Sequence, residues 1–262
     1  MTITNPQGTP IWYELMTSDL AAATPFYRAV LGWSIAANAD PLAGEMDYRM
    51  IERAGGGMAG GAMTLDPGMI TAGMKPCWQT YFGVDDVDTT VAKVESLGGS
   101  VNMPAATMEG VGRMAMLADP QGAMFYVMRG ASDETSDAFS VTDAGHCRWN
   151  ELSTSDAPGA LTFYEAALGL KHDGGMPMGD AGKYAFIAVG ETTIGAISPM
   201  MPPGARPGWL PYFGAASTSA AKTLIEANGG NVMMGPHEVP GGDWIVVGSD
   251  PQGAMFGIVG PK

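Results

Sequence analysis

Residues 11–33 read IWYELMTSDLAAATPFYRAVLGW, and residues 148–170 read RWNELSTSDAPGALTFYEAALGL. The second stretch follows the first at a constant offset, 148 − 11 = 137 residues, and shares with it W, EL, TSD, FY and LG in register without a gap. So many identities in register indicate a tandem duplication. Each copy reads as a strand of alternating side chains that runs into a helix opened by a capping Asp and closed by Gly.

A second motif pair extends the duplication to the rest of the chain. KPCWQTYFG at 75–83 returns as RPGWLPYFG at 206–214, and DPQGAMF at 119–125 returns unchanged at 250–256. Each half therefore reads twice as a strand, a helix and further strands. The stretch between the halves is rich in Ser, Thr, Asp and Glu, as in a linker. We expect domains at 1–129 and 145–262, joined by a linker at 130–144.

Composition excludes several partners. The 262 residues include only 13 Lys and Arg against 27 Asp and Glu, a net charge of −14, which argues against nucleic acid and anionic membranes as partners. Residues 1–10, MTITNPQGTP, do not resemble a signal peptide. The two Cys occupy unmatched repeat positions and are expected to be free thiols in the cytoplasm. The 21 Met suggest pliable core or pocket linings. The sequence leaves open a monomer or a homodimer.

The repeated motifs resemble those of one superfamily. They are EL-x-T-x-D…FY…LG at 14–32 and 151–169, VDDV at 84–87, and DP-x-G at 119–122 and 250–253. Together they are similar to the vicinal oxygen chelate superfamily, which includes glyoxalase I, bleomycin-resistance proteins and extradiol dioxygenases. The resemblance implies an α+β fold with tandem vicinal-oxygen-chelate domains, in which four βαβββ modules form two cup-shaped sheets. The chain looks most like two-domain, glyoxalase-like members.

The resemblance also locates the metal-ligand positions of the family. Family enzymes usually hold a divalent metal in the cup with His, Gln and Glu. The matched positions here are Trp12, Gln79, Tyr126, Trp149, Leu210 and Gly257, with one further position per cup within 58–62 and 193–197. Only Gln79 has a usable ligand atom, because indole, glycine and neutral phenol are not ligands of such metals. We therefore predict no metal and no cofactor, which argues against glyoxalase I and dioxygenase chemistry.

The family positions face the cup, so strand alternation predicts what fills it. The predicted ligand-binding residues are Trp12, Gln79, Tyr81, Met124 and Tyr126 in the first cup, and Trp149, Tyr212 and Met255 in the second. Leu210 also faces the second cup, and Gly257 adds no side chain there. Aromatic walls of this kind suit a small molecule. In the alternative, the aromatic side chains simply fill the cup.

Glu14 and Glu151 are the predicted catalytic residues. Each follows a Trp by two positions and shares its strand face. A carboxylate in an apolar cup can act as a general base or hold a cationic or hydroxyl-bearing ligand. The alternative is a structural carboxylate. Arg113 and Arg148 are candidate anion-binding residues or surface charges, and His237 is a candidate acid–base group or a solvated loop residue.

Three functions remain open from the sequence. The first is a glyoxalase- or bleomycin-resistance-like protein that binds a small, partly aromatic molecule in a cup that lacks most family metal ligands. The second is a lyase or isomerase that acts next to a carbonyl, with Glu14 or Glu151 as the base. The third is a non-catalytic interaction module. Whether the chain is an enzyme, and whether both cups are used, is left open.

Overall fold

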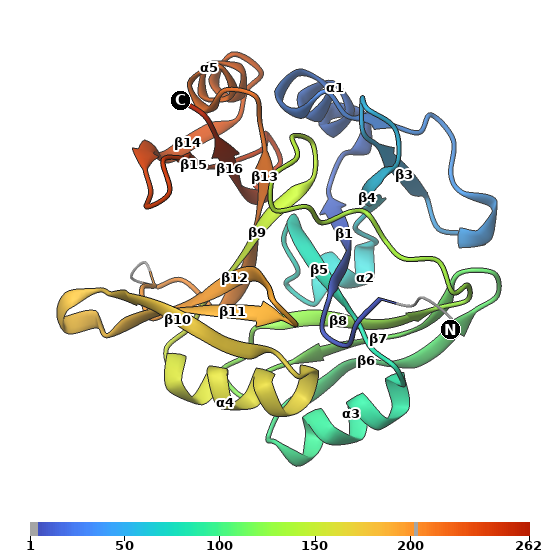
Figure 1. Ribbon diagram of the computed structural model, residues 1–262. Helices are drawn as coiled ribbons and strands as arrows, with labels where there is room; N and C mark the ends of the chain where they lie inside the picture. The colour runs from blue at the N-terminus through green and yellow to red at the C-terminus, as the bar shows by residue number, and fades with distance from the viewer. Residues whose placement is uncertain (1–4, 202–203) are drawn as a thin grey trace. The chain divides into compact units, whose positions relative to one another are not determined.

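The computed structural model describes residues 5–201 and 204–262 (Figure 1). Residues 1–4, the start of the segment expected not to be a signal peptide, lie outside that range. In the first half the elements are β1 (Pro10–Thr17), α1 (Leu20–Leu31), β2 (Ser34–Ile35), β3 (Tyr48–Glu52), β4 (Met58–Thr64), α2 (Pro67–Thr71), β5 (Cys77–Gly83), α3 (Val87–Ser96), β6 (Ser100–Met108), β7 (Gly112–Ala118) and β8 (Met124–Gly130). In the second half they are β9 (Cys147–Ser153), α4 (Ala157–Leu168), β10 (Lys171–Pro177), β11 (Lys183–Val189), β12 (Thr192–Ser198), β13 (Gly208–Gly214), α5 (Thr218–Ala227), β14 (Asn231–Glu238), β15 (Trp244–Ser249) and β16 (Met255–Gly260).

The strands form two mixed, eight-stranded sheets with the same topology. The order is β2-β3-β4-β1-β5-β8-β7-β6 in one sheet and β10-β11-β12-β9-β13-β16-β15-β14 in the other. In every module the first strand runs parallel to its last strand, as in β1 with β4 and β13 with β16, while the remaining pairs are antiparallel. The predicted α+β fold of four βαβββ modules is confirmed.

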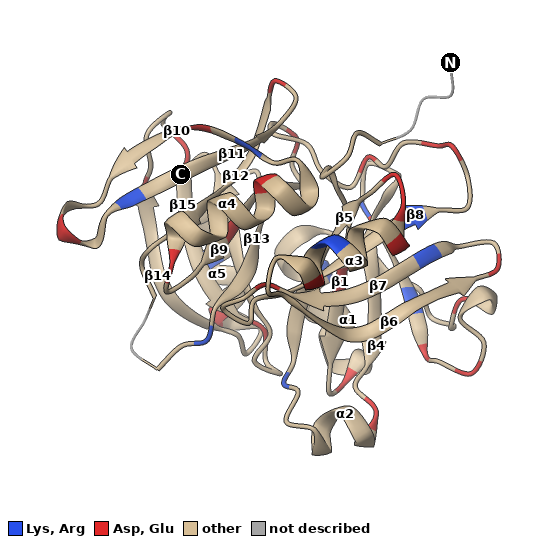
Figure 2. Cartoon of the chain, turned by 90° about the horizontal axis from the view of Figure 1, so that it is seen from below, with Lys and Arg blue, Asp and Glu red and all other residues tan. Residues whose placement is uncertain are grey.

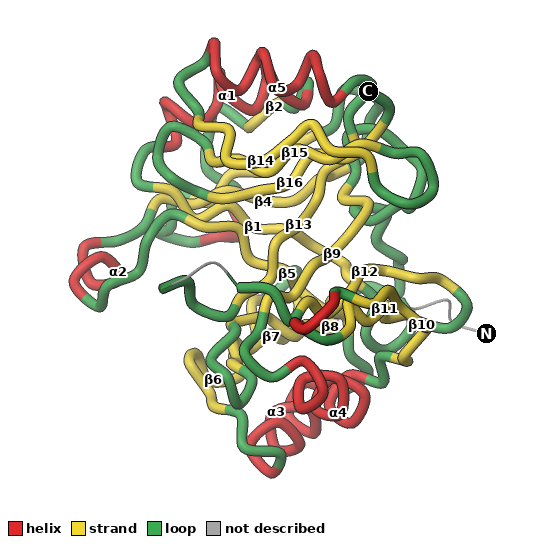
Figure 3. The backbone as a smooth tube through the Cα atoms, turned by 90° about the vertical axis from the view of Figure 1, so that its left-hand side faces the viewer, coloured by secondary structure: helices red, strands yellow, loops and turns green. Residues whose placement is uncertain are grey.

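The chain divides into two compact units that differ from the two halves of the sequence. Unit 1 contains the residues up to Ile11, 80–136 and 149–210, and unit 2 contains 12–79, 137–148 and 211–262. Each unit therefore joins one module from each half. Inside unit 1 helix α3 packs beside α4, and inside unit 2 helix α1 packs beside α5 (Figure 3). The predicted domain boundaries at 129 and 145 stay a prediction.

The helices begin where the sequence predicts them. Asp19 caps α1 by accepting a hydrogen bond from the backbone N–H of Ala22, and Asp86 caps α3 in the same way through Thr89. Helix α1 runs through Pro25 and ends at Gly32, whose φ of 69° is the left-handed conformation that glycine adopts at low cost. Among the described residues, no helix is long and apolar enough to cross a membrane. Figure 2 shows the few Lys and Arg positions scattered over separate elements.

The repeated motifs of the sequence meet in two equivalent buried hydrogen-bond chains. In unit 2 the indole N–H of Trp78 donates to the hydroxyl of Tyr27 (2.9 Å), which donates to Asp250 (3.0 Å). In unit 1 Trp209 donates to Tyr164 (3.0 Å), which donates to Asp119 (3.1 Å). We call these the Trp–Tyr–Asp chains. Each links a helix of one half to the DP-x-G turn of the other half, so the motifs that define the repeat have a structural role.

Burial raises the pKa of the tyrosine and aspartate side chains in both Trp–Tyr–Asp chains. It raises the pKa of both Tyr hydroxyls well above their ordinary value, and the nearby carboxylate raises it further. It also raises the pKa of Asp119 and Asp250, although backbone N–H groups and the Tyr hydroxyl act in the opposite direction. One oxygen of each Asp accepts two backbone N–H bonds within its own turn, for example from Gln121 and Ala123. The turn is thereby fixed against the helix.

Candidate functional site

The carboxylate of Glu151 lies in an aromatic cluster of unit 1. The indole N–H of Trp149 donates to the hydroxyl of Tyr184 (2.9 Å), and that hydroxyl donates to Oε2 of Glu151 (2.7 Å). The register of β9, β12 and β11 aligns Glu151 with Ala196 and Ala196 with Phe186, so the small Ala196 separates the carboxylate from the ring. The Phe186 ring stands edge-on to Trp149 and Tyr184, with centroids 5.9 and 6.0 Å away.

This arrangement, called the aromatic clamp below, is only partly closed. Trp149, Glu151, Tyr184 and Phe186 are all half-buried. The neighbours of Glu151 along the strand, Asn150 and Leu152, are fully buried on the opposite face. The clamp therefore holds a carboxyl group in a defined position at the border between protein interior and solvent.

Unit 2 contains a related but more buried arrangement around Glu14. The indole N–H of Trp12 donates to the hydroxyl of Tyr48 (2.7 Å), and Glu14 is only 3% exposed. Glu14 is aligned with Gly61 in β4, where a Cβ would overlap the Tyr48 ring. Glycine at position 61 is therefore what lets the Tyr48 ring lie over this strand.

Glu14 also lies close enough to Cys77, at the start of β5, to influence its ionisation. Burial raises the pKa of the Cys77 thiol, the amide of Gln79 lowers it through a hydrogen bond to Sγ (3.4 Å), and the charge of Glu14 raises it again. A raised pKa leaves less of the thiol as the nucleophilic thiolate, so this environment disfavours reactivity of Cys77. The structure thus brings together Trp12 with Tyr48, Glu14 with Cys77, and Cys77 with Gln79.

The remaining predicted residues of the first cup lie on β5 and β8 in unit 1. Tyr81 and Tyr126 are aligned in the parallel register and their rings stack, with centroids 4.1 Å apart and an interplanar angle of 0°. They are 4% and 6% exposed, and Met124 beside them is half-buried. The intervening Phe125 packs against Phe163 and Tyr164 of α4, so the tyrosines face away from the helix. We call this side of the strands the cup face.

The corresponding strands of the second half, β13 and β16, differ at the cup face. Tyr212 is aligned with Gly257, and a Cβ at Gly257 would overlap the Tyr212 ring. The ring therefore lies on the glycine in the place where Tyr81 meets a second tyrosine. Met255 is 39% exposed and Leu210 is half-buried.

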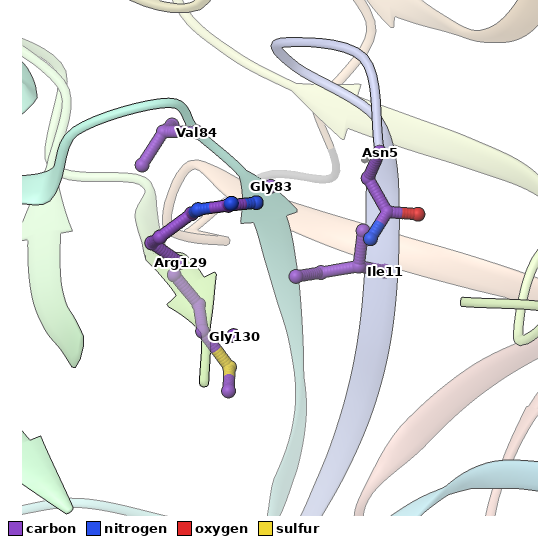
Figure 4. A pocket seen from close by; sticks show the side chains of 7 residues that line it. Asn5, Ile11, Gly83, Val84, Arg129 and Gly130 are labelled. Atoms are coloured by element: carbon purple, nitrogen blue, oxygen red, sulfur yellow. The ribbon is translucent and has the colours of Figure 1, made fainter. Parts of the chain in front are cut away.

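The charged candidates outside the cups are already engaged. Arg113 is paired with Asp88 (2.6 Å), and Arg148 with Asp243 (2.8 Å). Both are therefore held by carboxylates, while His237 is exposed on β14. A small hollow in unit 1 is lined by Asn5, Ile11, Gly83, Val84, Met128, Arg129 and Gly130 (Figure 4). Its volume of about 10 Å³ has room for about one water molecule, which is too small for a substrate.

The residues at the matched positions do not fit the divalent metal of the family. The Trp12 and Trp149 indoles use their only polar atom as a donor to tyrosine, and the Tyr212 ring covers Gly257. In the part of the chain that the structure describes, no three His, Cys, Asp or Glu side chains gather in a way that could hold a metal ion. The carboxylates of Glu14 and Glu151 are therefore the acidic groups of the two cups that could act on or hold a ligand.

Comparison with known proteins establishes the family. The profile of the Glyoxalase/Bleomycin resistance protein/Dioxygenase superfamily matches residues 10–127 and 144–258. The chain therefore belongs to this superfamily. It is 36% identical over 255 residues to the "Putative glyoxylase CFP32" of Mycobacterium tuberculosis, covering 97% of this chain and 95% of that protein. It is 32% identical over 266 residues to the "Anthracycline biosynthesis protein DnrV" of Streptomyces peucetius, covering 96% and 93%.

Solved structures share the fold. The Mn(II)-bound glyoxalase from Novosphingobium aromaticivorans superposes with a TM-score of 0.64 at 17% identity, covering 97% of this chain and 82% of that one. The 2,3-dioxygenase LapB from Pseudomonas sp. KL28 superposes with a TM-score of 0.64 at 16% identity, covering 99% and 94%.

Two tyrosines of the site are not apparent from the sequence. Tyr48 and Tyr184 belong to no repeated motif, yet each accepts the hydrogen bond of the cup-facing Trp. The sequence signal for them is their equivalent place at the start of a strand, one in each half of the repeat.

Proposed function

We propose that this protein binds a small, partly aromatic molecule and that Glu151 in the aromatic clamp is the polar anchor for it. The hydrogen-bond chain from Trp149 through Tyr184 to Glu151 carries this proposal. The phenol hydroxyl orients one carboxylate oxygen, and the rings of Trp149 and Phe186 supply flat apolar surface beside it. Such a site suits a ligand with a ring and a hydroxyl or cationic group.

The relatives support small-molecule chemistry in general terms. One is named as a glyoxylase and another as an anthracycline biosynthesis protein. These names describe those proteins, and they favour a small organic ligand over a macromolecule here. The same proposal includes the cytoplasm as the location, no nucleic acid partner, a monomer or homodimer, and no metal or cofactor. Metal analysis of protein purified without chelator tests the last point, because stoichiometric metal would contradict it.

A second candidate function is a lyase or isomerase that removes a proton next to a carbonyl. The burial of Glu14 beside Trp12 and Tyr48 favours it, since general bases are often carboxylates in largely desolvated sites. In an isomerase, Glu14 or Glu151 would take the proton and return it to the neighbouring carbon. In a lyase, the same residue would take the proton while the bond from the adjacent carbon to its leaving group breaks, and the electron pair of the C–H bond would form the new double bond. No electron acceptor is required.

Binding measurements on matched variants test both functions. A panel of small aromatic and carbonyl compounds would be screened by thermal shift and titration calorimetry against wild type, Glu151→Gln, Glu14→Gln and the exposed control Glu52→Gln. If Glu151 is the anchor, Glu151→Gln should weaken binding by roughly 1.5–3 kcal/mol, the range for a hydrogen bond to a charged group, and the control should not. If a carboxylate is the base, binding should persist while turnover falls by about 10²–10⁴. A panel without any binder would contradict the binding function.

A further inference from the structure

The cup face of β5, β6, β7 and β8 is built largely of methionine. Directly paired residues share a face, and the register aligns Tyr126 with Met116 and Met116 with Met103. The next row aligns Met128 with Met114. Alternation along β8 adds Met124 to the same face. Met108 also belongs to it, because it pairs with Gly112, which shares the face of Met114. The side chains of this surface, called the methionine face below, are those of Met103, Met108, Met114, Met116, Met124 and Met128.

The methionine face has a buried floor and a more exposed rim. Met114 and Met116 are buried, as are the stacked rings of Tyr81 and Tyr126 beside them. The other four methionines are half-buried. Methionine is flexible and polarisable, and its sulfur makes favourable contacts with aromatic rings. A rim of this kind can close around a flat ring system of variable outline, whereas branched aliphatic side chains would fit only one shape.

The charge around the methionine face favours a cation. Every residue that the register places on this face is uncharged. The basic residues of the same strands, Arg113 and Arg129, are paired with Asp88 and Asp133. The chain as a whole carries a net charge of −14. An acidic protein attracts positively charged ligands, and no basic side chain on this face opposes that attraction. The negative faces of the tyrosine rings attract a cation as well.

We propose that the methionine face binds a fused-ring aromatic molecule that carries a positive charge. This inference rests on the proposed function because it names a class of aromatic ligand. It adds a binding surface on β5–β8 of the first cup to the aromatic clamp on β9 and β11. Neutral fused rings should bind more weakly because they lack the attraction to the acidic protein. Cations with a single small ring should also bind more weakly because they cover less of the face.

Proflavine, a flat three-ring cation, is the probe for this inference. Acridone serves as the uncharged three-ring compound and benzylamine as the one-ring cation. Protein labelled with ¹³C at the methionine methyl groups gives separate signals that single Met→Leu variants assign. Proflavine should shift the signals of the half-buried rim methionines through ring currents and leave those of Met234 and Met255 unchanged. Acridone and benzylamine should each bind at least about tenfold more weakly.

A triple variant measures how much the rim contributes. Met103→Ala, Met124→Ala and Met128→Ala together should weaken proflavine binding by about tenfold or more. The control, Met200→Ala with Met233→Ala, changes two exposed methionines that are not among the predicted ligand-binding residues and should leave binding unchanged. Urea unfolding of both variants identifies any loss of fold. If the triple variant is unfolded, the methyl shifts of the wild-type protein decide the question alone.

The outcomes separate this inference from the proposed function. Unchanged affinity in a folded triple variant, or methyl shifts confined to Met234 and Met255, would overturn the methionine face while leaving Glu151 as anchor if Glu151→Gln still weakens binding. Equal affinity for acridone and proflavine would overturn the requirement for charge. If neither the three probes nor the wider aromatic panel binds, both proposals fail.

Discussion

The cup face of β5–β8 and the cup face of β13–β16 occupy equivalent places in the duplicated fold, yet their surfaces differ. The first has six methionines and two stacked tyrosines. In the second, Tyr212 lies on Gly257, and the register adds Val247 and Met234 in the same row. The opposite sides of the same strands remain alike, since each contributes to a Trp–Tyr–Asp chain. Duplication has therefore kept the side that holds the helices and varied the side that faces the cup.

The largest loss of stability is expected from breaking the Trp–Tyr–Asp chains, which both halves share. Asp119→Ala and Asp250→Ala each leave a buried tyrosine hydroxyl and two turn N–H groups without their acceptor. Each change should lower the free energy of unfolding by about 2–4 kcal/mol, the sum of one lost charged hydrogen bond and unsatisfied buried donors. Urea unfolding measures this. A lower free energy of unfolding in one variant but not in the other would show that the two Trp–Tyr–Asp chains do not contribute equally.

The contact between Tyr212 and Gly257 should be nearly as sensitive. Gly257→Ala places a methyl group in the volume of the Tyr212 ring, so we expect a cost of about 1–3 kcal/mol from overpacking. Gly208→Ala in β13 is the matched control, because no atom lies within 4 Å of the added Cβ there. Thermal unfolding of both variants gives the comparison. Equal stability of the two would mean that Tyr212 moves away freely.

The two Trp–Tyr pairs of the cups should respond unequally to loss of the hydroxyl. Tyr184→Phe removes the acceptor of Trp149 and the donor to Glu151, and we expect a loss of about 1–2 kcal/mol. Ligand affinity should fall with it, because Glu151 loses its orienting donor. Tyr48→Phe serves as the comparison in unit 2, where it should lower stability without changing affinity at the aromatic clamp. Calorimetric titration of both variants with one ligand separates stability from binding.

The smallest effect concerns pH. Burial raises the pKa of Asp119 and Asp250 above the ordinary value of 3.8, so the folded state holds these protons more tightly than the unfolded chain. Their contribution to stability is therefore complete below the unfolded pKa and is lost as the pH rises through the folded pKa. Replacing one of these two carboxyl groups should make the free energy of unfolding depend less steeply on pH in this range. Urea midpoints of wild type and Asp119→Asn between pH values near 4 and 7 test this sign, and a steeper profile in the variant would contradict it.

The fold follows from the sequence because its signals are local and repeated. Asp19 and Asp86 cap the predicted helices, and the DP-x-G turns lie where the motif places them. The repeated motifs also have a shared structural role, because the Tyr of the helix motif bonds the Asp of the turn motif. Tyr27 and Asp250 form this bond although they are 223 residues apart in the sequence.

The candidate site follows only in part, because it depends on register. Strand alternation is enough to place Glu14 opposite the core residues Tyr13 and Leu15. It does not show that Tyr184 on β11 reaches Glu151 on β9 across the intervening strand β12. The alternation of Met114 with Met116 is visible in the sequence, but only the pairing of β6 with β7 brings Met103 onto the same face.

The Trp–Tyr–Asp chains carry a consequence for how such a protein is made and how it arose. In each chain the tyrosine and the aspartate come from different halves. Neither bond can form before part of the second half has left the ribosome, and the bond between Tyr27 and Asp250 must wait for nearly the whole polypeptide. A half synthesised alone would hold one tyrosine and one aspartate that face outward for want of a partner, and a second identical half would satisfy both. The duplication thus places in one polypeptide the bonds that two copies of a single half would have to form between chains.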